Sequence, residues 1–200
     1  MKALQKTLLI AMAAAASAPA LAYEAGDVIV RAGAVQVTPE TTDNTMLTTL
    51  DVDDDTQLGL TITYMLSPKV GIELLGATPF KHDLTLSGAN IGSVEHLPPT
   101  VNLQYFPMDA GSALQPYVGV GLNYTKFWGE ENNLGLVISV EDSFGLAVEA
   151  GVDYKITDNV VLNASVWKVD INTNVSINGA SMGELEIDPL VAMVAVGYKF

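Results

Sequence analysis

Few side chains in this 200-residue sequence have the types and spacing that metal binding needs. The run Asp51-Val52-Asp53-Asp54-Asp55 resembles the start of an EF-hand calcium loop. That loop requires glycine and glutamate at the next two key positions, where the sequence has Thr56 and Ile62. We therefore interpret the acidic run as a solvated loop. The sequence has no cysteine, so a disulfide framework and a thiolate zinc site are excluded.

The residues that could support catalysis also lack a recognisable arrangement. His82, His96 and Ser143 fall near one rim in the strand assignment below, but no motif joins a nucleophile to a base and an orienting group. The segment Gly119-Val120-Gly121 lacks the third glycine and the helix of a nucleotide-binding turn. We expect no catalytic residue, no metal and no cofactor, and we expect both histidines to form hydrogen bonds at the rim. A lipid-modifying enzyme is the least supported alternative.

The composition combines strong acidity with high hydrophobicity. The formal net charge is −14, hydrophobic residues make up 49% and the mean hydropathy is +0.31. Charged residues are only 16%, against roughly 25% in an average soluble domain. A disordered acidic chain would be poor in apolar residues, and a nucleic-acid binder would need a basic surface. Both classes are excluded, and the question becomes where the apolar surface goes.

Residues 1–22 have the features of a secretory signal peptide. Lys2 and Lys6 supply the positive start, residues 8–16 are apolar, and Ala20-Leu21-Ala22 fits the small-residue cleavage rule. The apolar stretch is too short for a spanning helix, which needs about 20 residues. We expect cleavage after Ala22, so that residues 23–200 form the mature domain outside the cytoplasm.

The rest of the chain alternates between large apolar and small or polar residues, which is the signature of strands with two unlike faces. The alternation is clearest in 57–64, 116–124 and 144–154. Five further segments fit less cleanly, at about 27–37, 70–82, 96–106, 160–172 and 186–200. Short connections at 67–69, 108–114 and 157–159 alternate with long polar ones at 38–55, 83–95, 127–142 and 173–185. This pattern predicts an all-β fold, an eight-stranded antiparallel transmembrane β-barrel with short periplasmic turns.

A soluble barrel of the lipocalin kind would also alternate, but with its apolar face inward. Three details favour the membrane. The apolar face has tyrosines near the strand ends, as an interfacial girdle requires: Tyr64, Tyr105, Tyr124, Tyr154 and Tyr198. The opposite face is rich in glycine, which suits a crowded lumen. The chain ends in an alternating strand that closes on Phe200, the usual address for the barrel assembly machinery. We expect an integral protein of the bacterial outer membrane.

Motifs along the mature chain resemble the outer membrane protein W family (OmpW/AlkL). They are, in order, residues 23–27, 31–33, 56–61, 73–75, 78–80, 96–100, 116–119, 123–125, 152–154, 165–167 and 188–189. The resemblance implies a narrow hydrophobic channel that opens outward, is blocked toward the periplasm and releases ligand sideways into the membrane. It also implies that positions matching Leu75 and Trp167 line the constriction.

Placing the odd residues of every strand inside the barrel predicts the contents of its lumen. Its ionisable members fall in the periplasmic half or near mid-height: Arg31, Glu73, Glu149, Asp153 and Lys199. Buried charges persist when they are paired, and an eight-stranded barrel is barely wide enough for its own side chains. We interpret these residues as a periplasmic-side plug, with a selectivity filter or a proton path as the alternative.

Above the plug the inward positions become apolar. We expect the ligand channel to be lined by Val35, Leu75, Ala77, Trp167, Val169, Ile187, Val191 and Met193. Such a lining favours an alkyl chain or a small aromatic compound over ions and sugars. The alternative is ordinary core packing.

Three prolines fall where the third and fourth strands meet near the outer side: Pro79, Pro98 and Pro99. Proline donates no ladder hydrogen bond, so we expect strand pairing to fail there. A lateral opening is one interpretation, and a bulge at the barrel rim is the other.

The predicted function is passive uptake of small hydrophobic molecules with lateral release. The alternative is a structural or adhesive barrel that presents its outer loops and transports nothing. The expected partners are outer-membrane lipid and lipopolysaccharide, small hydrophobic ligands, and the barrel assembly machinery through Phe200. Lys168, on the lipid-facing side, is expected to reach the headgroups.

Overall fold

The computed structural model describes residues 23–40, 42–43, 50–86, 89–109, 111–132, 135 and 137–200. The expected signal peptide, residues 1–22, lies outside the described residues. Within the described ranges, no helix has the length and hydropathy that crossing a membrane demands.

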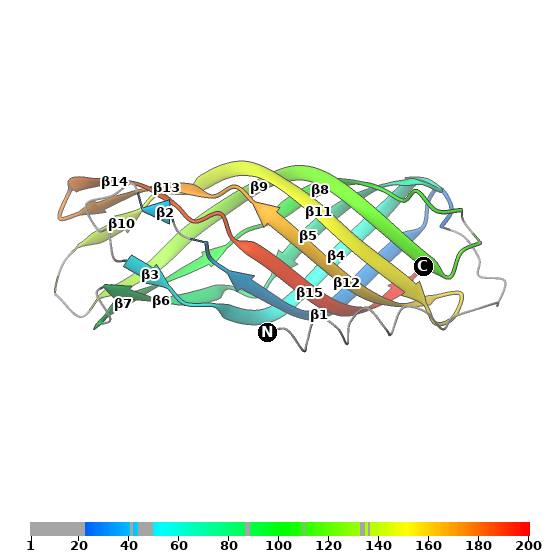
Figure 1. Ribbon diagram of the computed structural model, residues 1–200, viewed down its shortest axis with the longest axis horizontal. Helices are drawn as coiled ribbons and strands as arrows, with labels where there is room; N and C mark the ends of the chain where they lie inside the picture. The colour runs from blue at the N-terminus through cyan, green and yellow to red at the C-terminus, as the bar shows by residue number, and fades with distance from the viewer. Residues whose placement is uncertain are drawn as a thin grey trace.

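Within these residues, eight antiparallel strands close into a barrel (Figure 1). In chain order they are β1 (Val28–Thr38), β4 (Asp55–Ser67), β5 (Val70–Ala77), β8 (Thr100–Tyr105), β9 (Leu114–Asn132), β11 (Ser143–Lys155), β12 (Val160–Val169) and β15 (Leu190–Lys199). The ladder between β1 and β15 joins the two ends of the chain, with Arg31 opposite Gly197. Closure leaves no free edge over the paired length, so the backbone groups there are satisfied within the wall. The predicted fold class is confirmed.

The outward face of the wall is apolar. Leu58, Val120, Leu146 and Val194 are each more than 60% exposed, although large apolar residues are normally buried in a protein surrounded by water. Tyr64, Tyr105 and Tyr198 are about half exposed near the turn end of the barrel. An exposed apolar belt of this extent requires a hydrocarbon surrounding rather than water.

Both ends of the described chain lie at the turn end of the barrel. Phe200 and Val28 exchange backbone hydrogen bonds of 2.9 and 3.5 Å. The three short connections, which follow β4, β8 and β11, lie at this same end (Figure 1).

At the opposite end, several segments expected to be loops are strands. β6 (Phe80–Leu86) and β7 (Ala89–Leu97) form a hairpin that pairs with the upper part of β9 and with β3 (Leu50–Val52). A second sheet contains β2 (Thr42–Asp43), β10 (Ile138–Val140), β13 (Asn172–Ile177) and β14 (Ala180–Glu186). The polar composition of these segments reflects hairpins that extend beyond the apolar belt (Figure 1).

The inward assignment of odd residues is confirmed for seven of the eight strands of the barrel wall and is wrong for β8 and for β6. In β8 the even residues Thr100, Asn102 and Gln104 are buried, whereas Val101 and Tyr105 are half exposed. Asn102 lies opposite Glu73 and Gly121, and paired residues share one face of a sheet. The phase of each strand is therefore set by its register with its neighbours and not by counting along the chain.

Glycines on the inward face make room for large side chains, as expected. A Cβ atom built on Gly151 would lie 2.4 Å from the ring of Tyr117, and one on Gly59 would lie 2.9 Å from Val35. The lumen is thus filled by side chains at these heights.

Candidate ligand channel

Arg31 is the centre of a buried ionic network in the lower lumen. Its guanidinium donates to both carboxylate oxygens of Asp153, at 2.9 and 2.5 Å, and to Glu73 at 3.4 Å. It also donates to the hydroxyl of Thr63 at 2.8 Å. The side chains of Arg31, Glu73 and Asp153 are fully buried. A planar group with five donors is suited to hold two carboxylates at once.

The other two predicted plug residues lie on either side of this centre. Glu149 is buried and accepts two hydrogen bonds of 3.1 Å from Gln104. Lys199 lies nearer the end of the barrel, where it forms an ion pair of 3.5 Å with Asp27. The structure therefore brings Arg31, Glu73, Glu149 and Asp153 together and places Lys199 below them.

Below the ionic network lies an aromatic layer that the sequence analysis missed. The buried cluster contains Tyr23, Ile29, Met65, Phe106 and Tyr117. The Tyr23 hydroxyl donates to Asp153 at 2.6 Å, and its ring lies edge-on to Phe106 at 5.3 Å between centroids. Tyr23 and its neighbours thus fill the turn end of the barrel.

Replacing Tyr23 tests this layer. Tyr23→Ala removes a buried ring and should lower the free energy of unfolding by about 3 to 5 kcal/mol. Tyr23→Phe removes only the hydrogen bond to Asp153 and should cost about 1 to 3 kcal/mol. Urea titration of the mature barrel in detergent measures both. Equal losses in the two variants would contradict a packing role for the ring.

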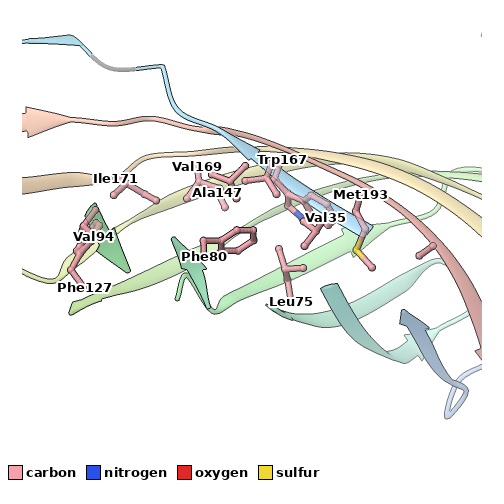
Figure 2. Packing of buried hydrophobic residues seen from close by; sticks show 13 residues of the cluster. Val35, Leu75, Phe80, Val94, Phe127, Ala147, Trp167, Val169, Ile171 and Met193 are labelled. Atoms are coloured by element: carbon pink, nitrogen blue, oxygen red, sulfur yellow. The ribbon is translucent and has the colours of Figure 1, made fainter. Parts of the chain in front are cut away.

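Above the network, the eight residues expected to line the channel gather in one apolar cluster. Val35, Leu75, Trp167, Val169, Val191 and Met193 are at most 5% exposed, and Ala77 and Ile187 pack against them. They come from β1, β5, β12, β15 and the segment before β15. Figure 2 shows Val35, Trp167 and Met193 gathered at one end of the cluster and Val94 and Phe127 at the other.

The cluster also contains residues that the sequence analysis did not select. Phe80, on β6, lies between the two ends of the cluster in Figure 2 and is only 1% exposed. Val94 and Phe127 extend the cluster outward. Val94 and Phe127 were not expected inside the barrel because they fall in the segments 83–95 and 127–142, which the sequence predicts to be loops. Phe80 was not expected there because even residues were assigned to the outer face. In β6 the even residues Phe80 and His82 are buried.

The wall is interrupted beside this cluster, at the prolines. The ladder between β5 and β8 ends at Leu75 opposite Thr100, and the ladder between β6 and β7 begins at Phe80 opposite His96. Between these two ladders, no residue of the segment 76–79 pairs with a residue of the segment 97–99, and the structure describes all seven residues. We call these two segments the wall break. One segment is a residue longer than the other, so the facing of side chains changes between β5 and β6.

Each segment of the wall break forms hydrogen bonds with its other neighbouring strand, which is β4 for residues 76–79 and β9 for residues 97–99. Thr78 donates its backbone N–H to Leu58 on β4 at 2.9 Å. On the other side, the Asn123 side chain on β9 donates to the carbonyl of Pro98 at 3.1 Å and to the Thr100 hydroxyl at 2.8 Å. The neighbouring Tyr124 backbone N–H donates to the carbonyl of Pro99 at 3.1 Å. These bonds give partners to the Thr78 N–H and to the carbonyls of Pro98 and Pro99, which stabilises the interruption.

The two faces of the wall break are both hollow. On the lumen side is a cavity of about 20 Å³ bordered by Leu75, Gly76, Ala77, Phe80 and Pro98 among others. On the outer side is a groove of about 440 Å³ bordered by Leu75, Gly76, Ala77, Pro99 and the outward residues of β4. Residues 75–77 thus border both spaces. The inner cavity has room for about one water molecule, so a larger occupant must displace Phe80 or its neighbours.

The groove lies below the outer polar rim of the barrel. There the Tyr124 hydroxyl donates to Asp142 at 2.6 Å. This hydrogen bond, together with one from the Phe127 backbone, lowers the pKa of the exposed Asp142 carboxyl. Lys168 forms an ion pair of 2.6 Å with Glu40, also near the outer end of the barrel wall. Leu58 and Leu60, which border the groove, belong to the apolar belt.

Comparison with known proteins agrees with the fold and its membrane setting. The sequence is 43% identical to Outer membrane protein W of Vibrio cholerae, over 96% of this chain and 97% of that protein. It is 42% identical to Outer membrane protein W of Escherichia coli, over 92% and 93%. The crystal structure of the outer membrane protein OprG from Pseudomonas aeruginosa superposes with a TM-score of 0.82 and 38% identity, covering 90% of this chain and 98% of that one.

The profile of the OmpW family matches residues 24–200, which is the whole described barrel. The apolar belt, the closed eight-stranded wall and these relatives place the protein in the outer membrane. This chain belongs to the OmpW family of outer-membrane proteins.

Proposed function

We propose that this barrel takes up small hydrophobic molecules from the outer side and releases them sideways into the membrane through the wall break. The observation that carries the proposal is that Leu75, Gly76 and Ala77 border both the lumen cavity and the outer groove. The two spaces are therefore separated by one strand segment, which pairs with β4 and, beyond Leu75, has no partner on its β8 side.

The contents of the lumen support this route over passage straight through the barrel. The ionic network and the aromatic layer below it fill the periplasmic half with buried side chains. An apolar molecule that entered that layer would strip hydrogen bonds from buried charges, which costs far more than its own burial gains. The apolar cluster above has no such penalty, and its exit of lowest cost is the wall break.

The proline pair supplies the first test. Pro98→Ala with Pro99→Ala restores two backbone N–H donors, which point to opposite sides of the strand, so one of them can add a ladder bond across the wall break worth about 1 kcal/mol. Pairing across the wall break should then compete with opening, and uptake should fall about fivefold. The measurement is the fluorescence rise of N-phenyl-1-naphthylamine in intact cells with the wild-type or the variant barrel.

Pro116→Ala is the matched control, because Pro116 lies in the paired wall opposite Val152. Its uptake should equal that of the wild type. A change in gel migration on boiling verifies that each variant is folded. If the folded double variant takes up the tracer as fast as the wild type, the lateral route is wrong. A structural or adhesive barrel would show no uptake above cells without it.

A related proposal concerns assembly. Phe200 is 70% exposed at the turn end, and its ring contacts Tyr198 at 4.7 Å between centroids. This exposed terminal aromatic pair supports recognition of the last strand by the barrel assembly machinery.

A further inference from the structure

Four rings form a continuous stack at the outer end of the apolar cluster. The centroid distances are 5.4 Å from Phe80 to His96, 4.9 Å from His96 to His82, and 5.6 Å from His96 to Phe127. The two imidazole planes are within 16° of parallel. His82 and His96 are 2% and 5% exposed. The hydrogen bond expected near the rim is present for His82, which bonds to the Asp53 carbonyl, whereas Nδ1 of His96 has no partner among the described residues. Strands β6 and β7 continue the barrel outward and turn both rings inside.

Two nitrogens of this stack lack a hydrogen-bond partner. Neither Nε2 of His82 nor Nδ1 of His96 has one among the described residues, and both atoms are buried. The nearby buried Asn123 is paired, since it donates to Thr100 and accepts from Thr125 at 2.7 Å. A buried polar group without a partner costs about 1 to 3 kcal/mol. His96 also borders the lumen cavity.

The hydrogen bond of His82 fixes which of its ring nitrogens carries a hydrogen. Its Nδ1 lies 2.5 Å from the backbone carbonyl of Asp53, which can only accept, so Nδ1 donates. In the neutral ring Nε2 is then a bare acceptor. Burial, and secondly the nearby His82, lower the pKa of His96 to about 3, so this ring is neutral at physiological pH. His96 pairs with Phe127 on β9, which is farther toward the outer end of the barrel than Tyr124. In this tautomer of His82, Nε2 offers a lone pair in an apolar setting.

We propose that His82 and His96 form a hydrogen-bonding subsite for small apolar compounds that carry one hydroxyl group, such as phenols and alcohols. The inference rests on the proposed channel function and specifies its substrate class. The flat rings of Phe80 and Phe127 contact the apolar part, while the hydroxyl donates to Nε2 of His82 or pairs with Nδ1 of His96. A hydrocarbon would leave both nitrogens unsatisfied, so the site prefers the hydroxylated compound over its parent hydrocarbon.

The test compares 2-naphthol with naphthalene, which differ only in the hydroxyl. The full mature barrel is reconstituted in lipid nanodiscs with ¹⁵N-labelled histidine, and empty nanodiscs correct for partition into lipid. The chain has only two histidines, so the imidazole spectrum contains two rings. We expect 2-naphthol to shift the Nε2 resonance of His82 toward the protonated end of its range and naphthalene to leave it in place.

Variants convert this into a binding measurement. His82→Phe and His96→Phe keep a ring in the stack and remove its nitrogens, so each should reduce the preference for 2-naphthol over naphthalene about fivefold to tenfold. Phe127→Leu perturbs the same stack without removing a nitrogen, so it should change both affinities by one factor. His96→Asn keeps a polar group and should retain part of the preference.

The outcomes separate the two proposals. If both probes bind but neither imidazole shifts, or if the preference survives both phenylalanine variants, the subsite is wrong and the channel stands. If neither probe binds above the empty nanodisc, the channel proposal fails together with the subsite.

Discussion

Arg31→Met should lower the free energy of unfolding by about 3 to 5 kcal/mol, because it leaves buried carboxylates without their cation. Asp153 would lose two charge-assisted hydrogen bonds and Glu73 one. All three side chains are fully buried, so water cannot replace the guanidinium without opening the barrel. Urea titration of the barrel in detergent, followed by tryptophan fluorescence, measures the loss.

Two further variants identify the cause. Lys69→Met removes an exposed ion pair of 3.7 Å with Asp109 and should cost no more than about 1 kcal/mol. Adding Glu73→Gln and Asp153→Asn to Arg31→Met removes the uncompensated charges and should restore more than half of the lost stability. If Arg31→Met lowers the free energy of unfolding no more than Lys69→Met does, Arg31 does not stabilise the barrel by compensating the buried carboxylates.

A covalent link across the wall break should abolish uptake of the tracer. If the ladder of β5 and β8 continued, Ala77 would lie opposite Pro98, and both residues border the lumen cavity. Ala77→Cys with Pro98→Cys places two thiols there in a chain that has no cysteine of its own. When a disulfide or a short bis-alkylating reagent joins them, uptake of N-phenyl-1-naphthylamine should fall to that of cells without the barrel. Reduction of the disulfide should restore it.

The control joins the same two strands where they are paired. Leu74→Cys with Val101→Cys links facing residues of the intact ladder below the wall break. This link restrains the hairpin in the same way but does not join the two segments of the wall break, so uptake should match the wild type. If both links abolish uptake, rigidity of the hairpin is the cause. If neither does, the molecule does not leave through this part of the wall.

Much of the site could be predicted from the sequence, because alternation reports which face a residue occupies. Val35, Leu75, Trp167 and Met193 share the inward phase of their strands, and all four are in one cluster. The prolines predicted failed pairing because a missing N–H is a local property. Arg31 could be matched with carboxylates on the same grounds, since a buried cation needs a partner.

The missed residues share one physical cause, which is that phase and register depend on neighbours. Gln104 and Asn102 face inward because β8 pairs with β5 in a register that chain counting does not reveal. Phe80 and His82 face inward because the wall break contains an unequal number of residues on its two sides, which reverses the facing of β6 relative to β5. His96, opposite Phe80, keeps the even inward phase of β8. Nothing local to Tyr23 predicts that its hydroxyl reaches Asp153, because the two residues are 130 positions apart in the chain.

The sequence by itself determined the class of the fold, the apolar belt and the position of the wall break, since each depends on residue type and spacing along one strand. Only the tertiary structure decided that Arg31 holds Asp153 and Glu73 together, that residues 75–77 border two spaces, and that the two histidines stack inside the barrel. Those contacts join residues far apart in the chain, such as Arg31 and Asp153. Their geometry is fixed by the register of eight strands closing on one another, which no single strand contains.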